Sequence, residues 1–368
     1  MMDSASRYHS LGKPSRANHL WRYTPWNKVH PTGDISEIPL LGKPKLSLRM
    51  IDGSEPPSGI RLEQGIGEDM DYSMDNSLTN AFLHASAKSS EWKLVADKGF
   101  YAKKPVILEI EVGDSPTIAH ISLDVGEMSE FELITRVTGS NEWFGLLRTG
   151  QIGKGAILNE IFLSLQESGT LVRSDAIAIG RDAQVRAGTV SSGSERTKSD
   201  LRYFLREHGG NIRVLGSILT TDSMHLDHHI EIHHEAPETF SRLSWHSACG
   251  GRSRTIGTGM LTIREGSKGA DAAQIFHNLL LSKFAEADAI PEIEVLENDV
   301  VGCGHGTANG PLDEKQLFYL KARGFDENGA KRTLIAAFLN STLSEMGGDE
   351  LHGWLINNLT LRLESINS

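Results

Sequence analysis

The chain is 368 residues long and carries a formal net charge of −11, from 37 Lys and Arg against 48 Asp and Glu. This length suffices for one large domain or two smaller ones with an ample core. Because no run of basic residues interrupts the acidic excess, nucleic acid and anionic membrane surfaces are not expected as partners.

The sequence carries no recognisable targeting segment. Its N-terminus lacks the apolar core of a signal peptide, and no apolar run is long enough to cross a bilayer. Cys249 and Cys303 are the only cysteines, which are too few for a disulfide framework. We therefore expect a soluble cytoplasmic protein in a reducing compartment.

Residues 1–75 are predicted to form a reduced N-terminal region of loops and short helix. Aromatic residues concentrate in Pro14–Trp26, and two interpretations fit them. They form a short amphipathic helix that stops before Pro25, or they anchor a tail to the main body, which is the interpretation we favour. Residues 31–74 are rich in Pro, Gly, Asp and Ser and are expected to be mostly loop.

Residues 76–300 are predicted to form an all-β body. A sandwich, a barrel and a β-solenoid all fit short strands separated by turn residues. The length of the body and its lack of Asn-Gly or Asp-Gly hairpin turns favour a solenoid of parallel coils. The predicted strands are Trp92–Val95, Val106–Val112, Ile118–Leu123, Glu130–Val137, Ala156–Leu165, Ala176–Ile179, Ile212–Leu219 and Leu226–Ile232.

Residues 301–368 are predicted to form a helical domain with three short amphipathic helices. The first follows Pro311, and the second begins at the N-cap Asp326 and ends before Gly347-Gly348. The apolar stripes of these helices must pack on the β body or bind a partner. The stripe of the third helix consists of Leu351, Leu355, Leu359, Leu363 and Ile366.

Two metal-capable side chains, Cys303 and His305, lie among glycines in the segment Gly302–Gly306. On an extended backbone they share a face, with Cα atoms about 7 Å apart. A thiolate and an imidazole placed in this way hold a soft or borderline metal only with further ligands from elsewhere. The motif is interpreted either as half of a shared metal site or as a half-buried Cys and a hydrogen-bonded His at the end of a strand.

The histidine-rich segment His225–Glu235 is a second candidate site. In an extended chain its odd-numbered residues all project to one side. Four of them have the ligand spacing of β-barrel metalloenzymes that hold iron, manganese or zinc: His225, His229, Glu231 and His233. The interpretation we favour is a polar sheet face whose histidines and acids pair through hydrogen bonds.

Other catalytic signatures are weak. His246 lies three residues before Cys249, but no third group orients a base, so a buried structural cysteine is expected. We find no P-loop, dinucleotide fingerprint or Gly-x-Ser-x-Gly elbow in the sequence.

The segment Ala270–Phe325 resembles the signature region of the SufB/SufD family, the scaffold subunits of the SUF iron–sulfur cluster assembly system. Upstream, His234–Ser241 is similar to the family's H-x-A-P-x-T-x-S element, and Trp21–Pro25 matches its W-[KR]-x-T-P stretch. The resemblance is strong over roughly the last third of the chain and thin near the N-terminus. The matching pieces of the signature are Asp271-Ala272, Gln274, Leu279–Ser282, Pro291–Glu294, Asn298–Val300, Cys303–Gly306, Gly310–Asp313, Gln316–Leu320 and Ala322–Gly324.

The resemblance implies a right-handed parallel β-helix between N-terminal and C-terminal helical regions. It implies that Ala270–Ala289 belongs to the last coils, although propensity alone favours a helix there. It also implies that the C-terminal helices dock a SufC-like ABC ATPase. The residues expected to make this contact are Leu317, Phe318, Leu320, Leu334 and Phe338.

One departure from the family pattern indicates the subtype. SufB-type members carry a reactive cysteine six residues before the proline matched by Pro291, where this chain has Ala285. They also carry a Glu directly after the histidine matched by His305, where this chain has Gly306. The resemblance therefore implies a SufD-like, non-catalytic subunit. Such a subunit contributes Cys303 and His305 to a transient cluster or iron site shared with a SufB-like partner, and the lone chain binds no cofactor tightly.

Two alternatives from other functional classes remain open. The first is a cupin-like metal-dependent enzyme that uses the strand His225–Glu235. The second is a β-solenoid adaptor without a metal role, which holds ATPases through its C-terminal helices. A homodimer of the isolated chain is a further alternative to pairing with a SufB-like subunit.

Overall fold

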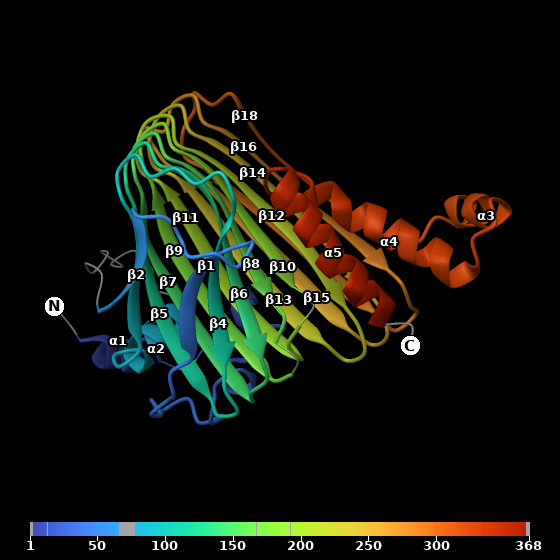
Figure 1. The fold of residues 1–368 in the computed structure, drawn as a ribbon, viewed down its shortest axis with the longest axis horizontal. Helices are drawn as coiled ribbons and strands as arrows, with labels where there is room; N and C mark the ends of the chain where they lie inside the picture. The colour runs from blue at the N-terminus through green and yellow to red at the C-terminus, as the bar shows by residue number, and fades with distance from the viewer. Residues whose placement is uncertain (1–2, 13, 66–77, 167, 192, 366–368) are drawn as a thin grey trace.

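The computed structural model describes residues 3–12, 14–65, 78–166, 168–191 and 193–365. The strands of this part of the chain form two nine-stranded sheets that wind into a β-solenoid of about 8 turns (Figure 1). From β3 onward, successive strands alternate between the two sheets, and each pairs in parallel with the next strand but one. The predicted mainly β, parallel solenoid architecture is therefore confirmed.

Two strand orders define the solenoid. Across the first sheet the order is β1 (Lys45–Met50), β4 (Val106–Val112), β6 (Glu130–Gly139), β8 (Ile157–Ser164), β10 (Gln184–Ser191), β12 (Asn211–Thr220), β14 (Phe240–Cys249), β16 (Asp271–Leu280) and β18 (Gly302–Pro311). Across the second it is β17 (Glu286–Val295), β15 (Arg254–Ile263), β13 (His225–His234), β11 (Arg196–Leu205), β9 (Thr170–Ile179), β7 (Trp143–Ile152), β5 (Thr117–Val125), β3 (Glu91–Ala96) and β2 (Ile60–Gln64).

The core of the solenoid fills the space between the two sheets. Alternate residues of each strand point into this lumen, as the two-residue period of a strand requires. Most are aliphatic or aromatic, including the fully buried Phe144, Leu201, Trp245 and Phe276. Their packing explains why the sequence reads as a series of short apolar runs.

An ionic cluster interrupts the apolar lumen. Arg148 on β7 forms ion pairs with Asp175 on β9 and with Glu160 on β8, and Arg173 on β9 also pairs with Asp175. All four side chains are buried, and together they connect the two sheets across the lumen. Burial opposes ionisation of Asp175, but the two arginines outweigh it and lower the pKa of its carboxyl to about 2. The pattern of short apolar runs gave no signal for this cluster.

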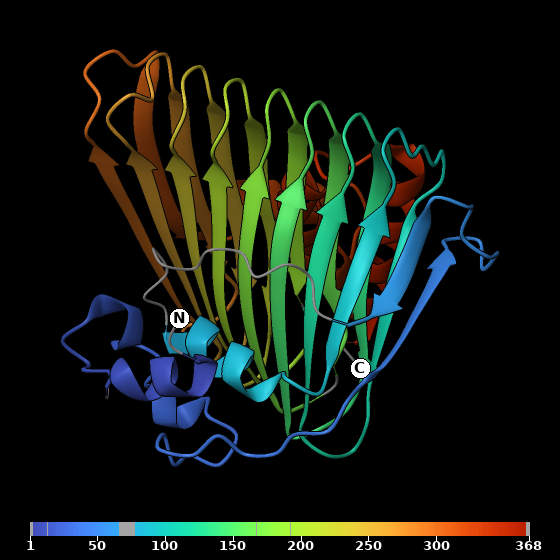
Figure 2. The same cartoon turned by 90° about the vertical axis from the view of Figure 1, so that its left-hand side faces the viewer.

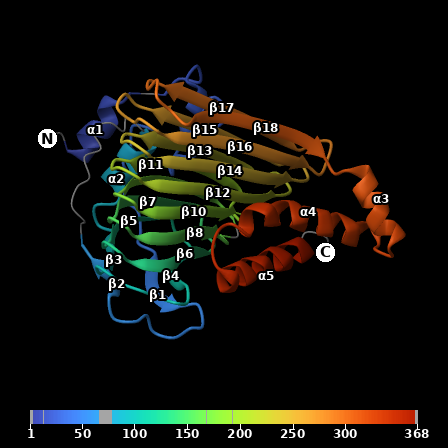
Figure 3. The same ribbon diagram turned by 90° about the horizontal axis from the view of Figure 1, so that it is seen from above.

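The two ends of the solenoid differ. At the N-terminal end, β1 and β2 add antiparallel to β4 and β3. At the C-terminal end, β17 and β18 each pair with one neighbour only, so both are edge strands (Figure 3). An edge strand presents unpaired backbone donors and acceptors, so this end is suited to pairing with another chain.

The N-terminal region lies against the outer face of the second sheet (Figure 2). It contains α1 (Ser4–Ser10), the short 3-10 helices η1 (His19–Trp21) and η2 (Trp26–Lys28), and α2 (Leu78–Ser86). Trp21 and Trp26 are buried with Phe82 of α2 in one aromatic cluster. The indole of Trp143 on β7 donates to the carbonyl of Val29 at 2.7 Å. The tail-anchoring interpretation is therefore confirmed, whereas a helix through Pro14–Trp26 does not form.

Several local predictions were incomplete. The segment expected to be mostly loop, residues 31–74, contains β1 and β2 in its described part. The interpretation of the body also missed α2 and five strands, whose buried polar residues obscure the alternating pattern: β7, β10, β11, β14 and β15. Residues 270–289 form β16 and the start of β17, as the family resemblance implied and against helical propensity.

Three helices follow the last strand, as predicted. They are α3 (Glu314–Ala322), α4 (Glu327–Leu343) and α5 (Asp349–Ser365). The carboxylate of the predicted N-cap, Asp326, accepts from the backbone N–H of Gly329. The helices α4 and α5 bury leucines against the outer face of the first sheet, whereas α3 extends away from the solenoid and buries none of its residues (Figures 1 and 3). Ile366, predicted to extend the last apolar stripe, lies outside the described residues.

Candidate functional site

Cys303 and His305 lie on the edge strand β18 at the open end of the solenoid. In the parallel register they pair with Ala272 and Gln274 of β16, whose side chains are buried in the lumen. Paired residues of parallel strands point to the same side, so the thiol and the imidazole project above the last filled layer of the lumen. Both residues are exposed. The pair is therefore accessible, and no further coil in the described part of the chain covers it.

The surroundings of the pair are open and weakly polar. A Cβ added at Gly304 or Gly306 would meet no atom within 4 Å, so the outer face of β18 is bare. Partial burial and the nearby carboxylate of Asp271 raise the pKa of the Cys303 thiol above its ordinary value. This thiol is therefore mostly protonated at neutral pH, and a bound metal or a cationic partner group would be needed to favour the thiolate.

Exposed apolar side chains flank the pair in the last coil. Leu296 and Val301, which lie in the connection between β17 and β18, are 57% and 74% exposed. Val295, at the end of β17, is also exposed. Apolar side chains beside two unpaired strand edges are features of a protein-binding surface.

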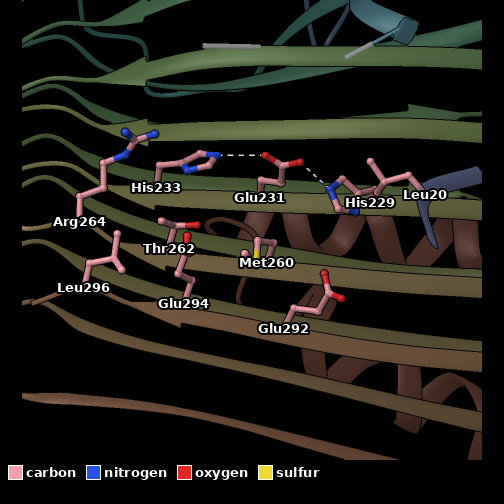
Figure 4. Close-up of a pocket in the computed structure, with 10 residues that line it drawn as sticks. All are labelled: Leu20, His229, Glu231, His233, Met260, Thr262, Arg264, Glu292, Glu294 and Leu296. Atoms are coloured by element: carbon pink, nitrogen blue, oxygen red, sulfur yellow. Dashed lines mark hydrogen bonds and ion pairs between the residues drawn. The ribbon is translucent and has the colours of Figure 1, made fainter. Parts of the chain in front are cut away.

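The histidine-rich segment forms β13, and its outward residues line a hollow of about 370 Å³ on the second sheet (Figure 4). The Glu231 carboxylate contacts His229 Nε2 at 2.6 Å and His233 Nε2 at 3.0 Å. Burial opposes ionisation of Glu231, but the charge of Arg202 and these two hydrogen bonds hold the pKa of its carboxyl well below the usual range. Glu292 and Glu294 of β17 form the opposite wall.

His225, the fourth member of the candidate metal set, has a different environment. Its Nε2 lies 2.9 Å from the hydroxyl of Thr24, and the same hydroxyl donates to Asp227 at 2.5 Å. Thr24 belongs to the W-[KR]-x-T-P stretch, so this contact holds the N-terminal tail on β13. Within the described residues, no group of three or more His, Cys, Asp or Glu side chains is arranged to hold a metal ion. The observed contacts match a hydrogen-bonded polar face.

The H-x-A-P-x-T-x-S element forms a turn between β13 and β14. Both ring nitrogens of His234 contact hydroxyls, Nδ1 at 2.7 Å from Thr239 and Nε2 at 2.8 Å from Ser241. The Thr239 hydroxyl donates to the carbonyl of Ala236, so its oxygen accepts from Nδ1–H and the Ser241 hydroxyl donates to Nε2. Burial lowers the pKa of His234 to about 4, which keeps the ring neutral. The element therefore has a structural role, because the hydrogen bonds of His234 hold the turn between β13 and β14 together.

Cys249 is buried at the end of β14, as expected for a structural cysteine. Burial raises the pKa of its thiol to about 11, so the thiolate is scarce at neutral pH. His246, the histidine three residues before Cys249 in the sequence, contacts the hydroxyl of Ser341 at 2.8 Å and stacks on the ring of Phe338. These contacts place His246 in the packing of α4 on the solenoid.

The residues expected to contact an ATPase fall into two groups. Leu317, Phe318 and Leu320 lie on α3, where Phe318 is 74% exposed. Leu334 and Phe338 lie on α4 and are half-buried, and Phe338 packs against the solenoid.

Comparison with known proteins identifies the family of this chain. The family model described as "SUF system FeS cluster assembly, SufBD core domain" matches residues 109–338, which is more than half of the chain. The chain therefore belongs to the SufBD family of iron–sulfur cluster assembly proteins. The predicted family is confirmed.

Relatives cover most of the chain at low identity. An iron–sulfur cluster assembly SufBD family protein of Mycobacterium leprae is 23% identical over 354 residues, which span 93% of this chain and 88% of that protein. The iron–sulfur cluster assembly protein SufD of Escherichia coli is 24% identical over 368 residues, which span 92% of this chain and 86% of SufD. Among the described residues, no helix has the length and apolar character required to cross a membrane.

Proposed function

We propose that this chain is a SufD-like scaffold subunit that pairs with a SufB-like subunit and docks a SufC-like ABC ATPase in the cytoplasm. The observation that carries the proposal is the position of Cys303 and His305, exposed side by side on the edge strand of an open solenoid end. Two ligands are too few to hold iron or a cluster, so a partner must complete the site. The subunit itself is proposed to have no enzymatic activity.

Pairing is proposed to occur through the open end. A SufB-like solenoid adding its own terminal strands to β17 and β18 would satisfy their free backbone groups and cover Leu296 and Val301. Such an end-to-end contact would enclose Cys303 and His305 between the two subunits. Iron or a transient cluster would then be cargo of the joint site.

ATPase docking is proposed to occur through α3 and the adjoining face of α4. The exposed ring of Phe318 on a helix that packs on little else supports this assignment. Closure of two ATPase protomers, one on each scaffold subunit, would transmit force to the joint between the solenoids. Opening of that joint would admit iron or sulfide to Cys303 and His305.

Co-expression with a SufB-like and a SufC-like protein, followed by anaerobic purification, tests the proposal. We expect a ternary complex whose visible absorbance shows a cluster. A ternary complex whose cluster yield is unaffected by removal of both Cys303 and His305 would instead support the adaptor function. A stoichiometric metal in the lone protein that His229→Ala removes would support the enzyme function.

A further inference from the structure

The last coil of the solenoid lacks the large apolar side chains that fill the earlier coils. In the register of β17 on β15, the residues that face the lumen are Ala287, Ala289, Pro291 and Ile293. The first three are small or rigid, and all four remain half-exposed. Packing alone therefore leaves the position of β17 relative to β18 weakly determined at the level of the Cys303 and His305 pair.

Gln274 crosses the lumen at this level. Its side chain is fully buried, and it pairs in register with His305 on the next strand. From β16 in the first sheet, its Nε2 donates to the backbone carbonyl of Glu292 on β17 at 2.8 Å. The hydrogen bond therefore joins the two sheets directly beneath the imidazole.

Gly259 makes room for the other end of the same amide. A Cβ at Gly259 would lie 2.0 Å from Gln274 Oε1 and 2.9 Å from the ring of Phe276. Gln274 Oε1 is buried and accepts no hydrogen bond from any described residue. A flipped amide would set this oxygen against the Glu292 carbonyl, so the donor bond fixes the orientation of the side chain.

A second amide crosses the lumen farther along β18. Asn309 Nδ2 donates to the carbonyl of Ala287 on β17 at 3.2 Å, and its Oδ1 accepts from Asn278 at 2.8 Å. Two polar cross-links thus replace apolar packing in the terminal coil. Of the two, only the Gln274 cross-link starts from a fully buried side chain and is in register with a site residue.

We propose that Gln274 is the positioning residue of the Cys303 and His305 site. Its cross-link to Glu292 fixes β17 relative to β16. Because β18 pairs with β16, the cross-link also sets the separation of β17 and β18, so the imidazole and thiol are oriented before a partner docks. This inference rests on the proposed function for the meaning of the site, but the geometry it asserts belongs to this chain alone. Loss of the cross-link loosens the terminal coil and leaves the other coils intact.

Gln274→Met in the full chain tests this assignment, because Met has a similar length and cannot donate. Hydrogen exchange of β17 and β18 is expected to accelerate about tenfold, the effect of one net hydrogen bond. The ring resonance of His305 in an NMR spectrum, assigned by its loss in His305→Ala, is expected to shift and broaden. We also expect Gln274→Met to lower the cluster yield in the reconstituted complex.

Gln166→Met is the matched control. Gln166 is also a fully buried glutamine whose amide donates hydrogen bonds, but it lies in the connection between β8 and β9. This variant is expected to speed exchange only around its own turn and to leave the His305 signal and the cluster yield unchanged. An equal effect of Gln166→Met on the His305 signal would overturn the assignment.

Two further variants keep the test decisive if Gln274→Met folds poorly. Gln274→Asn retains the amide but is one methylene too short to span the lumen, and Gly259→Ala pushes on Oε1 from the opposite sheet. Both are expected to reproduce the His305 signal change. A folded Gln274 variant with wild-type exchange and an unchanged His305 signal would overturn the proposal, whereas normal cluster yield in His305→Ala would overturn the proposed function only.

Discussion

The buried ring of His234 leads to a specific prediction about stability and pH. The folded protein lowers the pKa of this ring from its ordinary 6.5 to about 4, mainly because burial disfavours the charged form. The unfolded chain keeps the ordinary value. As the pH falls from 6.5 toward 4, the unfolded chain therefore binds more protons than the folded chain, and the free energy of unfolding decreases.

The magnitude follows from the difference between the two pKa values. Each pH unit inside this window costs about 1.4 kcal/mol, so His234 alone removes about 3 kcal/mol between pH 6.5 and pH 4. Between pH 7 and pH 5 the loss is about 2 kcal/mol. His234→Gln removes the titrating ring and keeps a side chain able to donate and accept hydrogen bonds.

Urea unfolding of the wild type and of His234→Gln at pH 7 and pH 5 measures this effect. We expect the wild type to be the more stable protein at pH 7, because its ring is satisfied by Thr239 and Ser241. The stability gap should narrow by about 2 kcal/mol at pH 5. Other buried histidines, such as His228, are present in both proteins, so their contributions to the free energy of unfolding cancel in the difference. A difference in stability between the two proteins that does not change with pH would refute the conclusion that His234 is neutral because it is buried.

Three further predictions follow from the structure. Thr24→Val removes the hydroxyl that donates to Asp227, and we expect it to destabilise tail docking by about 1–3 kcal/mol, seen as faster proteolysis of the N-terminal region. A disulfide exchange reagent should titrate one thiol in the folded protein, because Cys303 is exposed and Cys249 is buried, and two after unfolding. Phe318→Asp should weaken ATPase binding at least tenfold without lowering the melting temperature, because α3 buries no residue.

Each of these predictions has an outcome that contradicts it. Unchanged proteolysis of Thr24→Val would show that the Thr24 hydroxyl does not help to hold the tail on β13. Two reactive thiols in the folded protein would mean that β14 opens readily. A lower melting temperature of Phe318→Asp, with normal ATPase binding, would place the docking surface elsewhere.

The solenoid could be predicted from the sequence because the pattern that indicates it, short apolar runs separated by turns, extends along the whole body. Short apolar runs without hairpin turns require parallel coils, and the structure contains them from β3 to β18. A fixed repeat was not visible because successive coils differ in length. The strands of the second sheet begin at Thr117, Trp143, Thr170, Arg196, His225, Arg254 and Glu286.

Contacts between distant segments could not be predicted from local pattern. The ion pair of Arg148 with Asp175 depends on the stacking register of β7 and β9, which a pattern of short apolar runs does not reveal. The same holds for Gln274, whose role becomes visible only when Glu292 is placed across the lumen. By contrast, Cys303 and His305 were found from spacing alone, because two residues of one strand share a face whatever the fold.

The central claim is that Cys303 and His305 are half of an iron-handling site shared with a partner subunit. Its most direct test is the cluster absorbance of the anaerobically purified ternary complex containing His305→Ala, compared with the partly exposed control His208→Ala. We expect both variants to assemble with the partners and only His208→Ala to retain the cluster. Normal cluster yield with His305→Ala in a fully assembled complex would contradict the claim.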